Sequence, residues 1–264
     1  MKLTGTASLL STAFIIACAS APATIAPTPT NSQGSNPSQP VPSTSITVTP
    51  RPVSAVPRSG AWAFVYAAGI YTYTITTSAT VALIGDTTQK RSVPRLSQKA
   101  TIAISVSGDV QAIDPAVATS AICDSSAVLT TRAEQLVPKI PSHFMAGDHW
   151  RDSTTTTGCR GIIPTESQTI SNYIVIGDTT FANVGVVQIH RIDSLSATGE
   201  GSEEQHRILV TATGTGFVDL FFDITTGRLT GSHSSQTSLV SVTTSGRRTR
   251  FLQDITELVA LVAP

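Results

Sequence analysis

Charged side chains are scarce in this chain of 264 residues, in which Asp, Glu, Lys and Arg make up only 13%. The 17 basic residues balance the 17 acidic ones, and there is no long basic run. A nucleic-acid-binding surface needs a concentrated positive patch, so we do not expect one here. The densest basic group, Arg247-Arg248-Thr249-Arg250, is interpreted as a solvated hairpin tip.

The motifs of common catalytic and cofactor sites are missing as well. The chain has no GxSxG elbow, HExxH pair, Walker loop, GxGxxG fingerprint or paired-cysteine zinc pattern. We therefore expect no cofactor and no catalytic residues. The weak candidates for a metal site are His143, Asp148 and His149, with Asp152 nearby, but His-x5-His is not a known ligand spacing. Trp150 beside them is interpreted as a core anchor whose polar neighbours face water.

A second polar group lies between Gly199 and Glu204, where Glu200, Glu203 and Glu204 gather among glycines. We interpret it as a solvated hairpin loop. Calcium is the alternative ligand, although the alternating Asp and Asn residues of a calcium loop are absent.

The first residues have the features of an export signal. A short positive start at Met1-Lys2 precedes an apolar run, Leu9 to Ala17, that is too short to span a bilayer. We therefore expect an exported protein. An ordinary cleavage site is available at Ala19-Ser20-Ala21.

The end of that run, Ile15-Ile16-Ala17-Cys18, resembles the lipobox of bacterial lipoproteins. The resemblance implies that residues 1–17 are removed and that Cys18 carries a diacylglyceryl group and further acyl chains such as palmitate. Several acyl chains hold a protein firmly at a membrane. Because Ala19 rather than aspartate follows the cysteine, the sorting rule of Gram-negative lipoproteins favours the outer membrane, facing the periplasm or the surface.

Residues 18–58 are predicted to be a disordered tether. They are rich in Pro, Ser and Thr, with almost no charge and no aromatic residue. Such a segment cannot bury enough apolar surface to offset chain entropy, and its prolines favour extended conformations. Residues 59–264 are long enough for a single domain with a substantial core.

Three cysteines are present, so acylation of Cys18 leaves Cys123 and Cys159 as an even pair. In an exported protein an even pair suggests a disulfide. Free buried thiols and a metal site are the alternatives, and the spacing gives no CxxC.

Alternation of apolar and polar residues with a period of two recurs along residues 59–264 and predicts β-strands. Tyr71 to Leu83 and Val218 to Ile224 each place their apolar side chains on one face. Ile102, Ile104 and Val106 continue the pattern after the first of these, and Gly85 and Gly108 mark breaks. Residues 229–243 and 249–262 are predicted to form a terminal hairpin around Ser245-Gly246.

One segment is predicted to be helical. Asp124 or Ser125 can cap it, Pro138 stops it, and Leu129, Ala133, Leu136 and Val137 line one side. Helices and strands do not alternate, so a parallel doubly wound sheet is not expected. The predicted fold is all-β with one short helix, an antiparallel meander that forms either a β-sandwich or an open half-barrel.

Two further patterns concern the origin of the domain. Ile84-Gly85-Asp86-Thr87-Thr88 recurs at 176–180, which indicates either a duplication or repeated use of one turn. The helix, Ile140-Pro141 and Gly147-Asp148-His149-Trp150 together resemble a class of bacterial lipoproteins of unknown function, in which a short helix leads to a proline, a Gly-Asp-x-Trp turn and a run of strands. This resemblance supports the fold and implies no catalytic residue.

The sequence therefore predicts a noncatalytic binding or structural domain, anchored by lipid to the cell envelope. Its partners would be the membrane and either an apolar small molecule, held as in lipoprotein-carrier half-barrels by resemblance of architecture only, or an envelope protein or polysaccharide. The alternative is an envelope hydrolase acting through His143, Asp148 and His149.

Overall fold

The computed structural model describes residues 60–85, 90–114, 123, 131–160, 163–203 and 205–262, which belong to one compact unit. The predicted leader, Cys18 and the tether lie outside the described residues. So do Asp124, Ser125 and Leu129 of the predicted helix. Among the described residues, no helix is long and apolar enough to cross a membrane.

The described part of the chain is built almost entirely from strands, as the alternation predicted. The strands are β1 (Ala61–Ala63), β2 (Gly69–Leu83), β3 (Lys90–Ile104), β4 (Val110–Asp114), β5 (His143–Met145), β6 (His149–Arg160), β7 (Ile163–Phe181), β8 (Val184–Glu203), β9 (His206–Asp223), β10 (Arg228–Thr244) and β11 (Arg247–Leu261). The described helical residues are 131–134, and Ala133, Leu136 and Val137 are buried as predicted.

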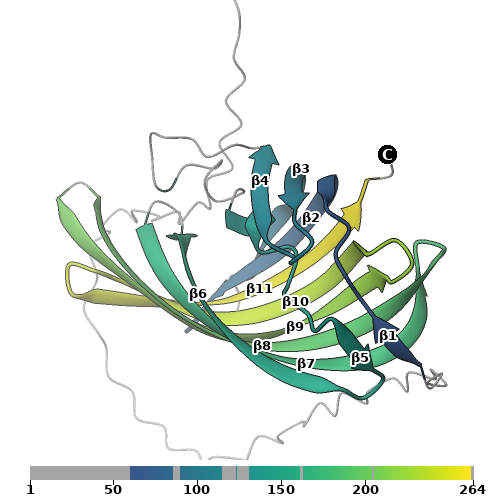
Figure 1. The fold of residues 1–264 in the computed structure, drawn as a ribbon. Coiled ribbons are helices and arrows are strands. Elements are labelled where there is room, and N and C mark those ends of the chain that lie inside the picture. Colours follow the sequence, from purple (N-terminus) through teal and green to yellow (C-terminus); the bar gives the residue numbers. More distant parts are fainter. Residues whose placement is uncertain are drawn as a thin grey trace, which may run out of the picture. The chain divides into compact units, whose positions relative to one another are not determined.

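Nine strands form one antiparallel sheet in the order β4-β3-β2-β11-β10-β9-β8-β7-β6. The last strand pairs with an early one, from Tyr73 opposite Leu261 to Leu83 opposite Phe251. The sheet curls strongly along its length (Figure 1). Since one sheet carries all the long strands, the fold is the open half-barrel and not the sandwich.

The concave side of this sheet, here called the inner face, carries small residues where the curl is tight. Along β9 the inner-facing series runs Ile208, Val210, Ala212, Gly214, Gly216. A Cβ atom added at Gly214 would lie 2.7 Å from the Thr237 carbonyl oxygen, and one at Gly216 would lie 2.7 Å from that of Ser235. Glycine is needed at these positions because the neighbouring backbone approaches so closely.

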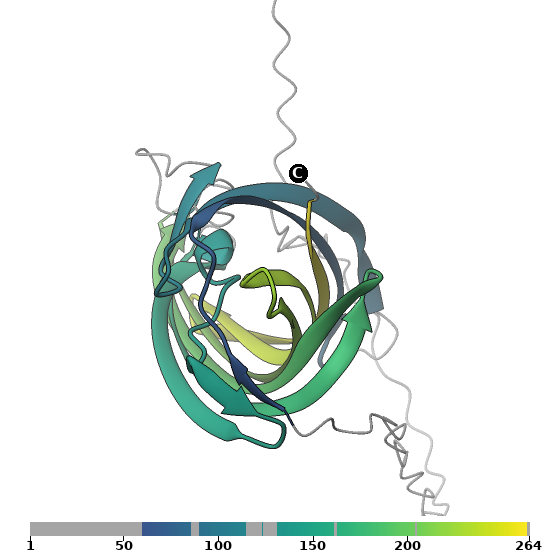
Figure 2. The same cartoon turned by 45° about the vertical axis from the view of Figure 1, so that its right-hand side comes forward.

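The short strands β1 and β5 pair with each other and cover one end of the inner face. Figure 2 shows the chain around β1 crossing the opening of the curl. Hydrogen bonds fix this crossing: the Phe64 amide donates to the Ser142 carbonyl, and the Ala67 amide to that of Gly227, at 2.8 Å each. Residues 60–68 therefore act as a cap over the sheet.

Two sequence-based predictions were wrong. Val106 does not continue the strand: β3 ends at Ile104, and Val106 is 64% exposed. A turn begins at Ser105, whose amide bonds to the Asp109 carbonyl, and Gly108 takes the positive φ that the turn requires.

The described residues of the two pentapeptide copies also differ in structure. Gly85 follows β2 in a turn, whereas Gly177 lies inside β7, at a register shift opposite Gln188. The second copy is therefore a β-bulge and not a strand end. The described residues give no support to a duplication.

Candidate functional site

The inner face is apolar and filled at its capped end. Phe64 from the cap makes edge-to-face contacts with Tyr66 and Phe222, with ring centroids 4.8 and 5.2 Å apart. Tyr73, Ile75, Ile189 and Leu220 are fully or almost fully buried beside them, in one continuous cluster.

Two tyrosine hydroxyls fasten this cluster to the backbone. The Tyr66 hydroxyl donates to the Pro138 carbonyl at 2.5 Å, and the Tyr73 hydroxyl donates to that of Leu229 at 3.0 Å. Burial raises the pKa of both tyrosines far above the ordinary value, because a tyrosinate here would lose its hydration.

The middle of the inner face is open and polar. It forms a hollow of about 220 Å³, here called the trough, between the end of the helix and strands β6 to β10. Its lining residues are Gln135, Thr156, Ser167, Thr169, Arg191, Asp193, Leu195, Thr215, Gly216 and Gln236. Leu195 is the one large apolar residue in this lining, so the trough offers hydroxyls and amides and not an apolar surface.

The two charges of the trough neutralise each other. The Arg191 Nε and Nη2 atoms donate to Asp193 Oδ2 at 3.0 and 2.8 Å. Ser171 Oγ donates to the other carboxylate oxygen at 2.7 Å, and the guanidinium lies over the Tyr173 ring, 5.8 Å from its centroid. The pair is fixed and has no net charge, while the neighbouring Thr169 and Gln236 side chains can donate and accept hydrogen bonds.

A second ion pair attaches the helix to the sheet. Arg132 pairs with Glu257 of β11, and its Nη2 atom donates to Thr77 Oγ1 at 3.1 Å. Burial lowers the pKa of Arg132. This contact positions Gln135, one turn further on, at the trough.

The sequence-predicted candidates His143, Asp148 and His149 lie elsewhere, around the turn between β5 and β6. Asp148 Oδ2 accepts the Met145 amide at 2.9 Å and so closes the turn. His143 and His149 are exposed, and the His143 ring contacts Ser142. In the part of the chain that the structure describes, no three His, Cys, Asp or Glu side chains gather as metal ligands. Trp150 stacks on Tyr173, 4.8 Å between centroids, and packs against the core.

The glutamate-rich segment is part of a hairpin and not a loop of cation ligands. Glu200 lies in β8 and receives two hydrogen bonds, of 2.6 and 2.7 Å, from Arg207 of β9. These bonds lower the pKa of Glu200. Its carboxylate is already engaged, while Glu204 lies outside the described residues.

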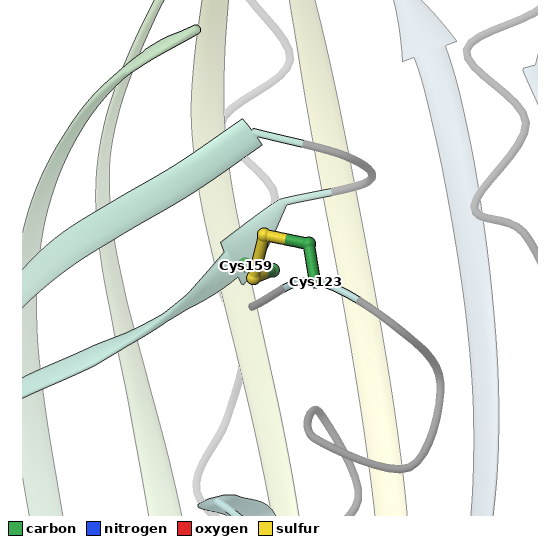
Figure 3. Close-up of a disulfide and its surroundings, with 2 residues drawn as sticks. All are labelled: Cys123 and Cys159. Carbon is green, nitrogen blue, oxygen red and sulfur yellow. A yellow bond between two sulfur atoms is a disulfide. The ribbon is translucent and has the colours of Figure 1, made fainter. Parts of the chain in front are cut away.

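Cys123 and Cys159 form a disulfide, the pairing that the cysteine count suggested. Figure 3 shows the bridge joining the last residues of β6 to the segment that precedes the helix. The bridge lies at the opposite end of β6 from Trp150. It links Cys123 to β6 at the end of the sheet that the cap does not cover.

Sequence reasoning missed the residues of the trough, although a signal was present. In β8 the inner-facing positions are Val187, Ile189, Arg191, Asp193, Leu195 and Ala197. An opposite-charge pair at i and i+2 interrupts an otherwise apolar series. Sequence reasoning also missed a row of polar and aromatic side chains on the outer face. There the His190 Nδ1 atom lies 2.7 Å from Asp219 Oδ1, and the His190 ring stacks on Phe217.

Comparison with known proteins gives little. No protein family matches the chain, and no curated protein matches it. A solved structure that the search found is OmpTΔL8, a loop L8 deletion mutant of OmpT, an outer membrane protein of Vibrio cholerae. It is 9% identical, with 74% of this chain and 100% of that chain covered and a TM-score of 0.13. So low a score carries no argument about fold or function.

Proposed function

We propose that this protein is a lipid-anchored, noncatalytic binding protein of the cell envelope, whose trough takes a small, neutral, hydroxyl-rich ligand such as one sugar unit of a glycan. The location rests on the leader and on the lipobox-like residues ending at Cys18. The binding role rests on the trough.

The observation that carries this proposal is the neutral, hydrogen-bonding lining of the open part of the inner face. The Arg191–Asp193 pair leaves no net charge to attract an ion. The hydroxyls of Thr156, Ser167 and Thr169 and the amides of Gln135 and Gln236 offer both donors and acceptors. A hydroxyl-rich ligand can satisfy such groups, whereas an apolar one would leave them unpaired at a cost in binding.

The size of the trough limits the ligand. Its volume of about 220 Å³ lies below the roughly 300 Å³ at which pockets for drug-sized molecules begin. The ligand is therefore a small molecule, or one unit of a longer polymer that leaves through the open side.

An apolar ligand is the competing proposal, and the packing of the inner face disfavours it. The apolar side chains of the inner face pack in two clusters, one at the capped end, where Phe64 and Tyr66 are themselves buried, and a smaller one of Ile163, Ile208 and Val210 beyond the trough. A lipid would have to displace these side chains.

The test is a titration of the full chain, in mild detergent, with a panel of neutral mono- and disaccharides and, separately, with oleate. Thr169→Val removes one trough hydroxyl at nearly constant shape and should weaken saccharide binding by roughly 3- to 10-fold, the value of one neutral hydrogen bond. Thr213→Val, on the exposed outer face of β9, is the matched control and should bind as the parent does. Oleate binding without saccharide binding would contradict the proposal.

The noncatalytic assignment has its own test. His149→Ala should leave both folding and ligand binding unchanged, because the exposed ring lies outside the trough. Loss of a hydrolytic activity in this variant, with folding intact, would favour the envelope hydrolase instead.

A further inference from the structure

A basic surface with exposed aliphatic side chains lies at one end of the sheet, where β2 ends and β11 begins. The first residues of β11 supply Arg247, Arg248 and Arg250, all exposed. With Leu83 and Ile84 they line an open hollow of about 580 Å³. The strand registers place the β8–β9 and β10–β11 turns at this same end.

Aliphatic side chains lie beside Arg248 and Arg250 on the outer face, while Arg247 takes the inner-facing position where β11 begins. Leu239 of β10 lies directly opposite Leu252 of β11, and Thr243 lies between Arg248 and Leu209 in the register. Each of the apolar residues is at least 36% exposed. We call this surface the hairpin rim, which consists of Ile84, Leu209, Leu239, Leu252, Arg247, Arg248 and Arg250.

The arginines of the hairpin rim keep their charge unneutralised. Arg248 donates to the Ser241 hydroxyl at 2.6 Å, and among the residues that the structure describes no carboxylate pairs with any of the three. Two nearby carboxylates already have cationic partners: Glu200 pairs with Arg207 and Asp254 with Lys90.

No cluster of arginines lies in the described turns at the other end of the sheet. These turns contain Asp109, Asp148 and Asp223, whose carboxylates accept hydrogen bonds from their own turns. The arginines are therefore concentrated at one end of the strands, although Glu200 and Glu203 of β8 lie at the same end. An anionic surface would orient such a domain as well as attract it.

We propose that the hairpin rim docks onto the surface of a bilayer that contains anionic phospholipid. Arginines pair with lipid phosphates, and exposed aliphatic side chains enter the boundary between head groups and acyl chains. A nucleic acid would use the arginines but would leave the leucines exposed to water. Docking by the hairpin rim is a contact separate from the trough and does not depend on what the trough binds.

This contact fixes the orientation of the domain at the membrane, which a lipid anchor alone cannot do. About 40 residues separate Cys18 from Gly60, and at full extension they span roughly 140 Å. Such an anchor would hold the domain near a bilayer and leave its orientation free. The hairpin rim sets the orientation, with the strands pointing at the surface and the trough facing sideways.

The test is vesicle flotation of the full chain carrying Cys18→Ser, so that no acyl chain contributes. The vesicles are phosphatidylcholine alone or a 3:1 mixture of phosphatidylcholine and phosphatidylglycerol. Binding to the mixture, little binding to the neutral vesicles and weakening as salt rises from 50 to 500 mM are expected. Equal binding to both vesicles would overturn the proposal, as would indifference to salt.

Substitutions locate the contact. The triple variant Arg247→Gln, Arg248→Gln, Arg250→Gln should bind the mixed vesicles roughly 100-fold more weakly, at about fivefold per arginine. The control removes the same charge away from the rim, by Arg95→Gln, Lys99→Gln and Arg151→Gln, all exposed, and should retain nearly full binding. Equal losses in the two triple variants would overturn the proposal.

Two further variants complete the test. The Arg250 side chain makes no hydrogen bond to the residues that the structure describes, so Arg250→Gln alone should weaken binding about fivefold even if the triple variant fails to fold. Leu252→Gln should weaken binding at every salt concentration. Binding to a DNA duplex at least as tight as to the mixed vesicles would identify the rim as a nucleic-acid surface and overturn the proposal.

Discussion

The capped end and the trough of the inner face differ in what fills them, although strands β7 to β10 contribute to both. At the capped end, aromatic and aliphatic side chains from the cap and the sheet close on one another. In the trough, the same strands carry hydroxyls, amides and a neutral ion pair around an open hollow. The comparison separates stability from binding: the capped end holds the domain together, and the trough is free to take a ligand.

The largest effect is expected at the capped end. Phe222→Ala removes a fully buried ring that contacts both Phe64 and Tyr66, and should lower the free energy of unfolding by about 3–5 kcal/mol. Leu195→Ala, in the partly exposed trough, should cost about 1 kcal/mol. Guanidinium unfolding followed by tryptophan fluorescence measures both. Equal losses would show that the trough is as much a packed core as the capped end.

The disulfide should contribute nearly as much to the free energy of unfolding as the Phe222 ring does. It lies at the end of the sheet that the cap does not cover. Replacing both Cys123 and Cys159 with Ser opens a loop of 36 residues and should cost about 3–4 kcal/mol. Thermal unfolding with and without a reducing agent measures this. The double variant should not respond to the reductant. An unchanged midpoint for the reduced parent would contradict the expected role.

The tight curl between the two regions can be tested at one glycine. In Gly216→Ala the new methyl group meets the Ser235 carbonyl oxygen and the Gln236 backbone, which should cost about 1–3 kcal/mol. Gly158→Ala is the control, because nothing lies within 4 Å of its added Cβ atom. In chemical unfolding, Gly216→Ala should have a lower free energy of unfolding than Gly158→Ala. Equal stabilities would mean that close strand approach does not set the curl.

The capped end alone is tested by an effect that is absent near neutral pH and appears only in alkali. Burial raises the pKa of Tyr66 and Tyr73, so their folded forms keep a proton that the unfolded chain loses near pH 10. The contribution of the two protonated tyrosines to the free energy of unfolding is fully present below pH 10. It falls as the pH rises, by up to about 1.4 kcal/mol per pH unit for each tyrosine.

The double variant Tyr66→Phe, Tyr73→Phe isolates this effect. It should be less stable at pH 8, because the hydrogen bonds to Pro138 and Leu229 are lost, but should decline less steeply between pH 10 and 12. Unfolding free energies measured across that range provide the check. Parallel declines would place the alkaline sensitivity outside the capped end.

Local patterns in the sequence predicted much of the fold. Alternation located Leu220 and Phe222 on the core face of β9, and Ser245-Gly246 marked the last hairpin correctly. The choice between sandwich and half-barrel depended on contacts distant in sequence, above all the pairing of β2 with β11. No local pattern encodes that pairing.

The trough was harder to predict for a related reason. Arg191 and Asp193 are close in sequence, but Thr169 and Gln236 join them only because the sheet curls. The curl depends on glycines such as Gly216, which in the sequence resemble ordinary breaks. The histidines near Trp150 attracted attention by residue type, and the structure places them at an exposed turn.

The most direct test of the contrast between a filled apolar end and an open polar trough is native mass spectrometry of the full chain, extracted gently from its own membranes. We expect a noncovalent adduct of a small, hydroxyl-rich molecule, reduced in abundance in the Thr169→Val variant and retained in full in Thr213→Val. A lipid-sized adduct that organic solvent releases, and that survives Thr169→Val, would contradict this expectation.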